Sequence, residues 1–178
     1  IRSYAGGISD LNARKIRLIG DPETRYREDP VRMLRAIRFA TKLDMQIDSV
    51  TASPIKQLAP LLADIPAARM YEEVIKLFFS GKAQATYKMM QEYGLFAPLF
   101  PQISRLIAED PKGNTAKMLD AVMKSTDDRV NQDKPVTPAF FYAALLWYPL
   151  IQRADDIAVE SGLPIYDANV AAMGDVME

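Results

Sequence analysis

Apolar residues recur at helical spacing along most of the chain after Asp21, and capping residues or prolines interrupt them roughly every ten to twenty residues. The strongest helix signal begins at Asp29-Pro30 and continues over residues 31–43, because Asp can cap free amide groups and Pro suits a first turn. Its apolar positions cover more than one face, so much of this helix should be buried. Further helices are predicted over residues 68–81, 83–93, 99–108, 114–125, 138–161 and 167–177. The pattern therefore predicts an all-α protein, an irregular array of many helices.

Only the first residues have the composition of β-strands. The two candidate segments, residues 1–5 and 15–19, are separated by Gly6-Gly7 and a short polar stretch. We interpret them as a short β remnant, the last edge of a sheet whose remainder lies outside the chain. The chain also starts without Met and stops inside an amphipathic segment without a cap, so we expect it to be a piece of a longer protein.

Composition narrows the available chemistry. The chain has no cysteine and no histidine, which removes disulfides, thiolate catalysis, imidazole acid–base chemistry and the usual zinc sites. A formal net charge of −1 argues against a surface that grips nucleic acid everywhere, so such contact needs a local basic patch. No apolar run reaches the roughly 18 residues of a membrane span, and the first residues lack the layout of a signal peptide. We therefore expect a cytoplasmic protein without a membrane span.

The segment Glu28-Asp29-Pro30-Val31-Arg32 carries the clearest candidate chemistry. An acid and a base three residues apart at a helix start can project side by side. Asp29 would accept from the amino group of adenine while Arg32 donates to the neighbouring ring nitrogen. Guanine and uracil would place a carbonyl against Asp29 and be rejected, whereas cytosine would not. The same spacing also fits an ordinary capped helix with a surface Arg, so spacing alone leaves both interpretations open.

Longer stretches of sequence resemble a known family. GGISDL (6–11), IRLIGDPETRYREDPVRMLRAIRFA (16–40) and DIPAARMYEEVIKLFFSG (64–81) resemble the neck of the bacterial class II nucleotidyltransferases, which are poly(A) polymerases and CCA-adding enzymes. A looser resemblance continues from LFAPLFP (95–101) to LLWYPL (145–150), where the chain looks more like a poly(A) polymerase. The resemblance covers nearly the whole chain.

This resemblance implies roles for the first motif. In the family, the Asp and Arg of an EDxxR motif select the base of the incoming nucleotide, and these residues correspond to Asp29 and Arg32. Glu28 would orient Arg32 or hold the turn. Arg35 and Arg38 would meet the triphosphate or the RNA backbone, or would pair with acidic residues of the second motif.

The resemblance implies supporting roles elsewhere in the chain. Residues of a second family motif, in the segment 64–81, would contact Arg32 or Arg35 and hold them in position. A solvated charged helix face would give the same sequence pattern. These residues are Arg69, Glu72 and Glu73. Residues between the family's catalytic head domain and the neck would form a hinge, although an ordinary tight turn also fits the sequence. These residues are Gly6, Gly7 and Asp10.

The family's catalytic residues have no counterpart here. Its members hold two Mg²⁺ ions on a Gly-Ser-Asp-x-Asp element that does not occur in this chain, so no catalytic residue is assigned and we expect the segment alone not to polymerise. The acidic pairs at 127–128 and 155–156 read as solvated surface acids. The resemblance divides the chain into a head edge (1–20), a neck (21–81) and a body (82–178).

Three functions are compatible with the sequence. The first is addition of AMP from ATP to RNA 3′ ends, with Mg²⁺ and ATP as cofactors of the complete enzyme and the RNA 3′ end as partner. The second is CCA addition, which the Asp29–Arg32 pair does not distinguish from polyadenylation. The third is a non-enzymatic helical module that binds RNA or a protein through the Arg32, Arg35 and Arg38 stripe. A DNA-reading helix-turn-helix fits poorly, because the Arg-bearing helix should be largely buried.

Overall fold

The computed structural model describes residues 6–177 and is mostly helical, which confirms the predicted all-α class. The described chain forms two compact units. The first comprises the residues up to Leu99 together with Met123–Pro135, and the second comprises Phe100–Val122 and Val136 onward. The elements of the first unit up to Leu99 are α1 (Gly7–Asn12), β1 (Lys15–Ile16), α2 (Pro22–Glu28), α3 (Val31–Leu43), β2 (Gln46–Ile47), α4 (Ser49–Ala52), α5 (Ile55–Leu58), the 3₁₀ helix η1 (Ala59–Asp64), α6 (Ala67–Phe78), α7 (Ala83–Glu92) and α8 (Phe96–Leu99).

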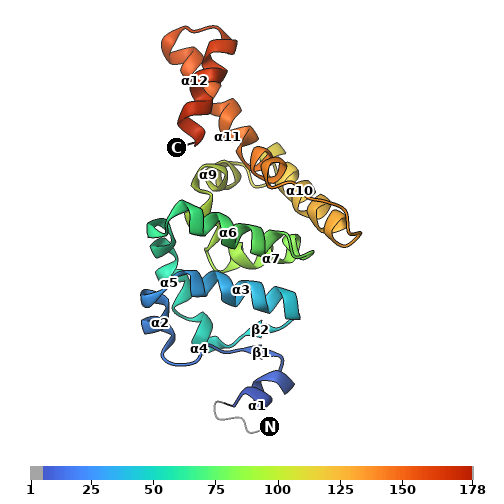
Figure 1. The fold of residues 1–178 in the computed structure, drawn as a ribbon. Helices are drawn as coiled ribbons and strands as arrows, with labels where there is room; N and C mark the ends of the chain where they lie inside the picture. Colours follow the sequence, from blue (N-terminus) through green and yellow to red (C-terminus); the bar gives the residue numbers. More distant parts are fainter. Residues whose placement is uncertain (1–5, 178) are drawn as a thin grey trace. The chain divides into compact units, whose positions relative to one another are not determined.

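Helix α3 is the centre of the first unit, where it packs against α6 and α7 (Figure 1). Three of its side chains, Met33, Leu34 and Ile37, are completely buried, and so are Leu77 and Phe78 at the end of α6. Burying each such side chain contributes about 1.5–3 kcal/mol to folding. The burial of α3 on more than one side, expected from its sequence, is therefore confirmed.

A buried polar contact fixes how the three helices meet. The Thr86 hydroxyl of α7 lies 3.2 Å from the Thr41 hydroxyl of α3 and 3.4 Å from the Leu77 carbonyl of α6. Because an unpaired buried hydroxyl is costly, these contacts favour one packing arrangement over alternatives. Thr86 of α7 thus links the buried Thr41 of α3 to the end of α6.

The β structure is smaller than the sequence pattern indicated, and its pairing differs. Strand β1 has two residues and pairs in parallel with β2, so its partner lies within the first unit. The strand expected over residues 1–5 lies outside the described residues. The polar stretch after Gly6 is largely helical, since α1 extends from Gly7 to Asn12. A two-residue partner strand is too short to leave a recognisable sequence pattern.

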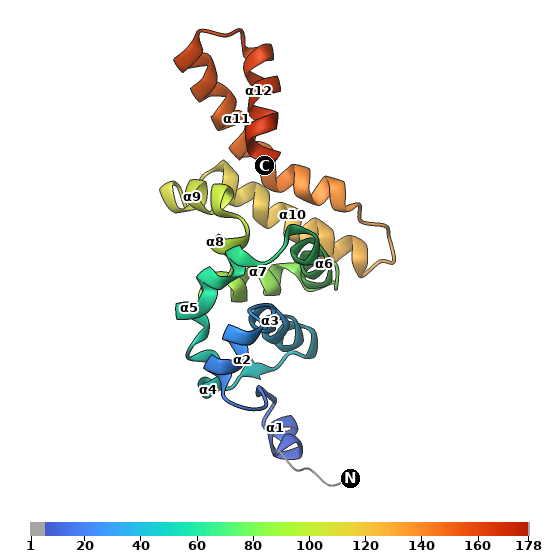
Figure 2. The same cartoon turned by 60° about the vertical axis from the view of Figure 1, so that its left-hand side comes forward.

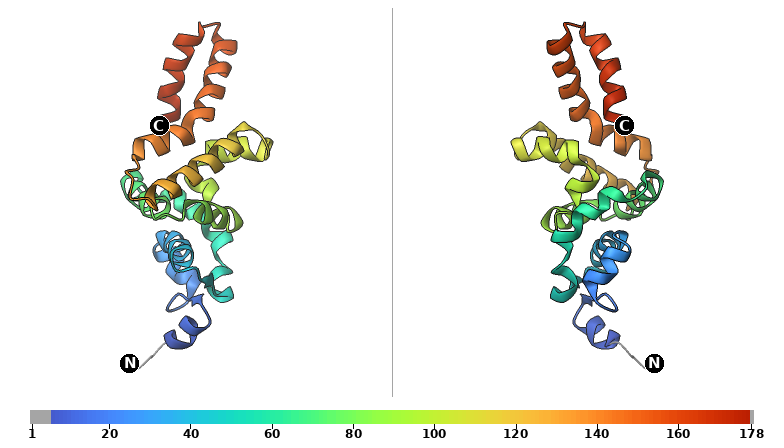
Figure 3. Two further views of the ribbon diagram at one scale, coloured as in Figure 1. Left: turned by 90° about the vertical axis from the view of Figure 1, so that its right-hand side faces the viewer. Right: turned by 90° about the vertical axis from the view of Figure 1, so that its left-hand side faces the viewer.

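The second unit contains helices that the periodicity predicted well. It includes α9 (Pro101–Glu109), the first part of α10 (Asn114–Val130), α11 (Pro138–Ser161) and α12 (Ile165–Met177). Figures 2 and 3 show α11 and α12 side by side, and they pack through small residues such as Ala154, Ala168 and Ala172. Gly162 ends α11 in the left-handed conformation with φ of +68°, as its glycine signal predicts.

Candidate functional site

Asp29 lies in the turn between α2 and α3, and its carboxylate does not cap α3. Helix α3 begins at Val31 with Pro30 as the residue before it and no side-chain cap. The Asp29 backbone carbonyl instead accepts from the Arg32 N–H at 3.0 Å. The expectation that the Asp29 side chain caps this helix is therefore wrong. Its carboxylate instead binds a cation from a different helix.

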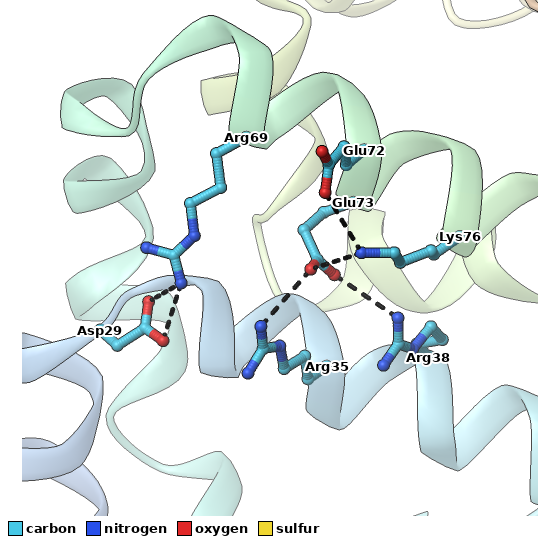
Figure 4. A network of polar contacts seen from close by, with 7 residues as sticks. All are labelled: Asp29, Arg35, Arg38, Arg69, Glu72, Glu73 and Lys76. Atoms are coloured by element: carbon cyan, nitrogen blue, oxygen red, sulfur yellow. Dashed lines mark hydrogen bonds and ion pairs between the residues drawn. The ribbon is translucent and has the colours of Figure 1, made fainter.

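That cation is Arg69 on helix α6 (Figure 4). Its Nη2 atom donates to both carboxylate oxygens of Asp29, at 2.9 and 3.0 Å. The Asp29 side chain is 19% exposed and that of Arg69 is 43% exposed. A single nitrogen shared by two oxygens is weaker than the two parallel hydrogen bonds that an Arg can make with a carboxylate. The pair nevertheless fixes the direction in which Asp29 points.

Arg32 occupies a different environment from Asp29. Its Nε atom is buried and has no hydrogen-bond partner among the described residues. Within that part of the chain, Arg32 also forms no ion pair. It lines a cavity of about 370 Å³ together with Arg35, Ala36 and Phe39, which lie on the same face of α3.

The rest of the cavity lining comes from β1 and the residues directly after it, from α2 and from α4. The remaining lining residues are Ile16, Arg17, Leu18, Ile19, Arg25 and Thr51. Asp29 is not among the lining residues. The two residues expected to act side by side are thus adjacent through the backbone, but their side chains have separate surroundings in this structure.

Glu28 does not orient Arg32. Its carboxylate accepts from Arg25 at 3.0 Å, one turn earlier on α2, and its side chain is half exposed. Glu28 therefore holds Arg25, which itself lines the cavity, while Arg32 has no acidic partner in the described chain.

Glu73 is the buried centre of the second motif (Figure 4). Its side chain is 4% exposed and lies 3.5 Å from each of three cations, namely Arg35 and Arg38 on α3 and Lys76 on α6. A buried carboxylate with several cationic partners is not the solvated helix face that its sequence pattern also allowed. Of the two proposed targets of bracing, Arg35 is contacted by Glu73 and Arg32 is not.

The other residues of the second motif behave differently. Arg69 contacts Asp29 instead of Arg32 or Arg35. The Glu72 side chain is 70% exposed and pairs with Lys76 at 3.6 Å on its own helix. Glu72 thus fits the solvated-surface alternative, since exposed pairs of this type contribute little to stability.

The expected hinge residues begin α1. Gly6 precedes the helix with φ of +70°, a conformation that strains most other residues. Asp10 accepts two hydrogen bonds from Arg17, at 2.9 and 3.1 Å, and Arg17 also reaches Asp48 at 3.2 Å. The hydrogen bond from Arg17 lowers the pKa of Asp10, and Asp10 in turn raises the pKa of Arg17. The contacts of Arg17 with Asp10 and Asp48 thus link α1 to Asp48, the residue before α4.

Sequence reasoning missed several of these positions. The cavity residues Arg17 and Arg25 carried no motif, and Phe39 was treated only as an apolar helix position. Asp127 was interpreted as a solvated acid, but its carboxylate accepts the backbone N–H groups of Ala83 and Gln84 at the start of α7. The sequence gives no local sign of this contact, because Asp127 lies more than forty residues from the helix start that it caps.

The implied magnesium has no ligand set in the described residues, where no three carboxylates gather closely enough to hold a metal ion. Within the same residues, no helix is long and apolar enough to cross a membrane.

Comparisons with known proteins point to one family. Residues 44–107 match a family model described as "Probable RNA and SrmB- binding site of polymerase A". The whole chain is 53% identical to poly(A) polymerase I of Escherichia coli O6:H1, of which it covers 38%. About half of the chain, 90 residues, is 41% identical to a CCA-adding enzyme of Limosilactobacillus reuteri and covers 22% of it.

The fold is also found in solved structures. A structure described as "tRNA-processing enzyme (apo form 2)" matches with a TM-score of 0.61 at 20% identity, covering 96% of this chain and 48% of that one. The chain thus spans well under half of the length of the curated relatives it matches. It is a homologue of part of bacterial poly(A) polymerase I and belongs to the class II nucleotidyltransferase family.

Proposed function

We propose that the protein adds AMP from ATP to RNA 3′ ends and that this chain selects the base through Asp29 and Arg32. In this proposal, residues 1–20 are the edge of a catalytic head, 21–81 the neck and 82–178 the body. The observation that carries it is 53% identity to poly(A) polymerase I over all 178 residues. Mg²⁺ and ATP would supply the chemistry on a head domain, and the RNA 3′ end would be the acceptor.

Asp29 and Arg32 each retain the hydrogen-bonding capacity that base reading requires. Asp29 has two oxygens with several lone pairs, and Arg69 occupies them with one nitrogen, so an adenine amino group can still donate to the carboxylate. Arg32 is a charged donor without a partner in the described chain. A ring nitrogen would supply the missing acceptor, whereas the guanine carbonyl would repel Asp29.

The contacts from α6 support this role indirectly. Arg69 orients Asp29, and Glu73 holds Arg35 and Arg38 on one side of α3. A reading site works only if its groups are held in position before the ligand arrives. We assign Arg69 and Glu73 as positioning residues and Arg35 and Arg38 as phosphate or RNA contacts.

The start of α1 is proposed as the joint between head and neck. Gly6 and Gly7 provide backbone freedom, and the Asp10–Arg17–Asp48 contacts tie α1 to the neck side of the joint.

The test of base selection is Arg32→Ala in the complete protein. Base reading predicts that the preference for ATP over GTP falls while the affinity for the RNA primer is retained. Arg27→Ala is the matched control, because Arg27 is an exposed Arg of α2 that pairs with Glu23 and does not line the cavity. An unchanged nucleotide preference in Arg32→Ala would refute the assignment.

CCA addition is the alternative enzyme activity, and the 41% identity to a CCA-adding enzyme over half the chain favours it. The Asp29–Arg32 pair does not separate the two, because cytosine presents the same order of amino group and ring nitrogen. Incorporation onto a tRNA lacking CCA, compared with a generic RNA, distinguishes them. Addition of C residues would contradict the polyadenylation proposal.

A non-catalytic binding module is the alternative of another class. The family model matched by residues 44–107 is described as "Probable RNA and SrmB- binding site of polymerase A", which favours RNA binding by this part of the chain. If Arg32 only docks RNA, Arg32→Ala weakens primer binding with a shallower salt dependence and leaves the nucleotide preference unchanged.

A further inference from the structure

Helix α3 presents a continuous face to the cavity that Arg32 lines. The cavity residues of this helix are spaced by three or four positions, so they follow one another along a single side. They are Arg32, Arg35, Ala36 and Phe39. The cavity volume of about 370 Å³ lies in the range of about 300–1,000 Å³ that suits small-molecule ligands.

The charged residues that line the cavity are four arginines, and no acidic residue is among the lining residues. Three of its four arginines, Arg17, Arg25 and Arg35, pair with acidic residues that lie outside the lining. The fourth, Arg32, has a buried Nε without a partner in the described chain. The cavity is therefore suited to a ligand that carries hydrogen-bond acceptors or negative charge.

Phe39 gives the same cavity an exposed aromatic surface. This side chain is 44% exposed, although it lies on the central helix of the unit. The Arg38 guanidinium lies over its ring, 5.0 Å from the centroid, which helps to hold the ring in place. Exposed aromatic rings among basic side chains are the surfaces on which proteins stack the bases of single-stranded nucleic acids.

We propose that Phe39 stacks a nucleobase in this cavity and that Arg32 and Arg35 meet the polar edge or phosphate of the same nucleotide. The inference rests on the proposed function in taking a nucleotide as the ligand. Because Arg32 is proposed to read the incoming base, the expected nucleotide is the incoming ATP. The 3′-terminal residue of the RNA presents the same ring and phosphate chemistry and is the alternative that the test distinguishes; its binding here would contradict the base-reading role of Arg32. Phe39 would then be a binding residue in addition to Asp29 and Arg32.

The test compares variants of Phe39 that separate stacking from apolar packing. Phe39→Ala removes both, Phe39→Leu keeps apolar volume, and Phe39→Trp keeps an aromatic face. Loss of one stacked base lowers affinity by about 5- to 150-fold. We therefore expect Phe39→Ala and Phe39→Leu to weaken binding and Phe39→Trp to retain it.

Two measurements on the complete protein identify which nucleotide is stacked. Fluorescence anisotropy with end-labelled oligoadenylate gives the affinity for RNA, and steady-state kinetics give the KM for ATP. Weaker oligoadenylate binding with unchanged KM supports the RNA 3′ end as ligand. A raised KM for ATP with unchanged oligoadenylate affinity supports the incoming nucleotide.

Leu43→Ala is the matched control, because Leu43 is an exposed apolar residue one turn further along α3 and does not line this cavity. We expect it to change neither quantity. The proposal is overturned if Phe39→Ala leaves both unchanged, if Leu43→Ala has the same effect, or if Phe39→Leu retains binding that Phe39→Trp loses. Loss of ATP preference in Arg32→Ala with no effect of the Phe39 variants would refute only the stacking role.

Discussion

The contact between Arg69 and Asp29 makes a prediction about how base selection depends on α6. If Arg69 acts by orienting Asp29, then Arg69→Met should lower kcat/KM for ATP only while Asp29 is present. Methionine keeps an unbranched apolar side chain and removes the donor. The relevant comparison is therefore a double-mutant cycle of Arg69→Met with Asp29→Ala.

The geometry of the pair sets the expected size of these effects. One Arg69 nitrogen serves both Asp29 oxygens at 2.9 and 3.0 Å, and the Arg69 side chain is 43% exposed. Solvent screening places such a contact at about 0.5–1 kcal/mol, which corresponds to a decrease of about 2- to 5-fold in kcat/KM. Asp29→Ala removes a hydrogen bond to a charged group, worth about 1.5–3 kcal/mol, or about 10- to 150-fold.

The assay is incorporation of ATP and of GTP by the complete protein under single-turnover conditions. The double variant should match Asp29→Ala alone, because Arg69 has nothing left to orient. Arg27→Met with Glu23→Gln is the control cycle, since this exposed pair on α2 should not affect selectivity. Fully additive losses from Arg69→Met and Asp29→Ala would refute the reasoning.

Other contacts give predictions that are independent of base selection. Glu73→Gln should lower the free energy of unfolding by about 2 kcal/mol or more, because it removes a buried charge that holds three cations, whereas Glu72→Gln should stay within about 0.5 kcal/mol in the same thermal unfolding measurement. Asp127→Ala removes the cap of α7 and should cost about 0.5–2 kcal/mol, and an unchanged unfolding midpoint would contradict the capping role. The lowered pKa of Asp10 means that its contribution to stability is present above the ordinary value of 3.8 and is lost as pH falls through the lowered pKa. An NMR titration should therefore give Asp10 a pKa below 3.8 that returns toward that value in Arg17→Gln, and equal pKa values in both proteins would contradict the contact.

The sequence predicted the helices because their apolar spacing is a local property. The range of α11 agrees with its predicted bounds, since Pro138 and Gly162 mark its two ends in the sequence. The pairing of β1 with β2 was missed, because a two-residue strand is recognisable only through the partner that folding brings to it.

The candidate site was predictable in its residues and not in their contacts. The extended motif identified Asp29, and its distance from Arg69 in sequence gave no sign that the two side chains meet. Phe39 looked like one more apolar position of a buried helix, and only the folded chain shows it exposed beside arginines. Side-chain partners across elements depend on the packing of α3 against α6, which no local pattern encodes.

The most direct test of base selection removes single atoms from the nucleotide. Purine riboside triphosphate lacks the 6-amino group, and 1-deaza-ATP lacks the ring nitrogen beside it. If Asp29 and Arg32 read the base, the unsubstituted protein uses each analogue about tenfold less well than ATP. Asp29→Ala then no longer distinguishes purine riboside triphosphate from ATP, and Arg32→Ala no longer distinguishes 1-deaza-ATP from ATP. If both variants discriminate against both analogues as strongly as the unsubstituted protein does, Asp29 and Arg32 do not read the base.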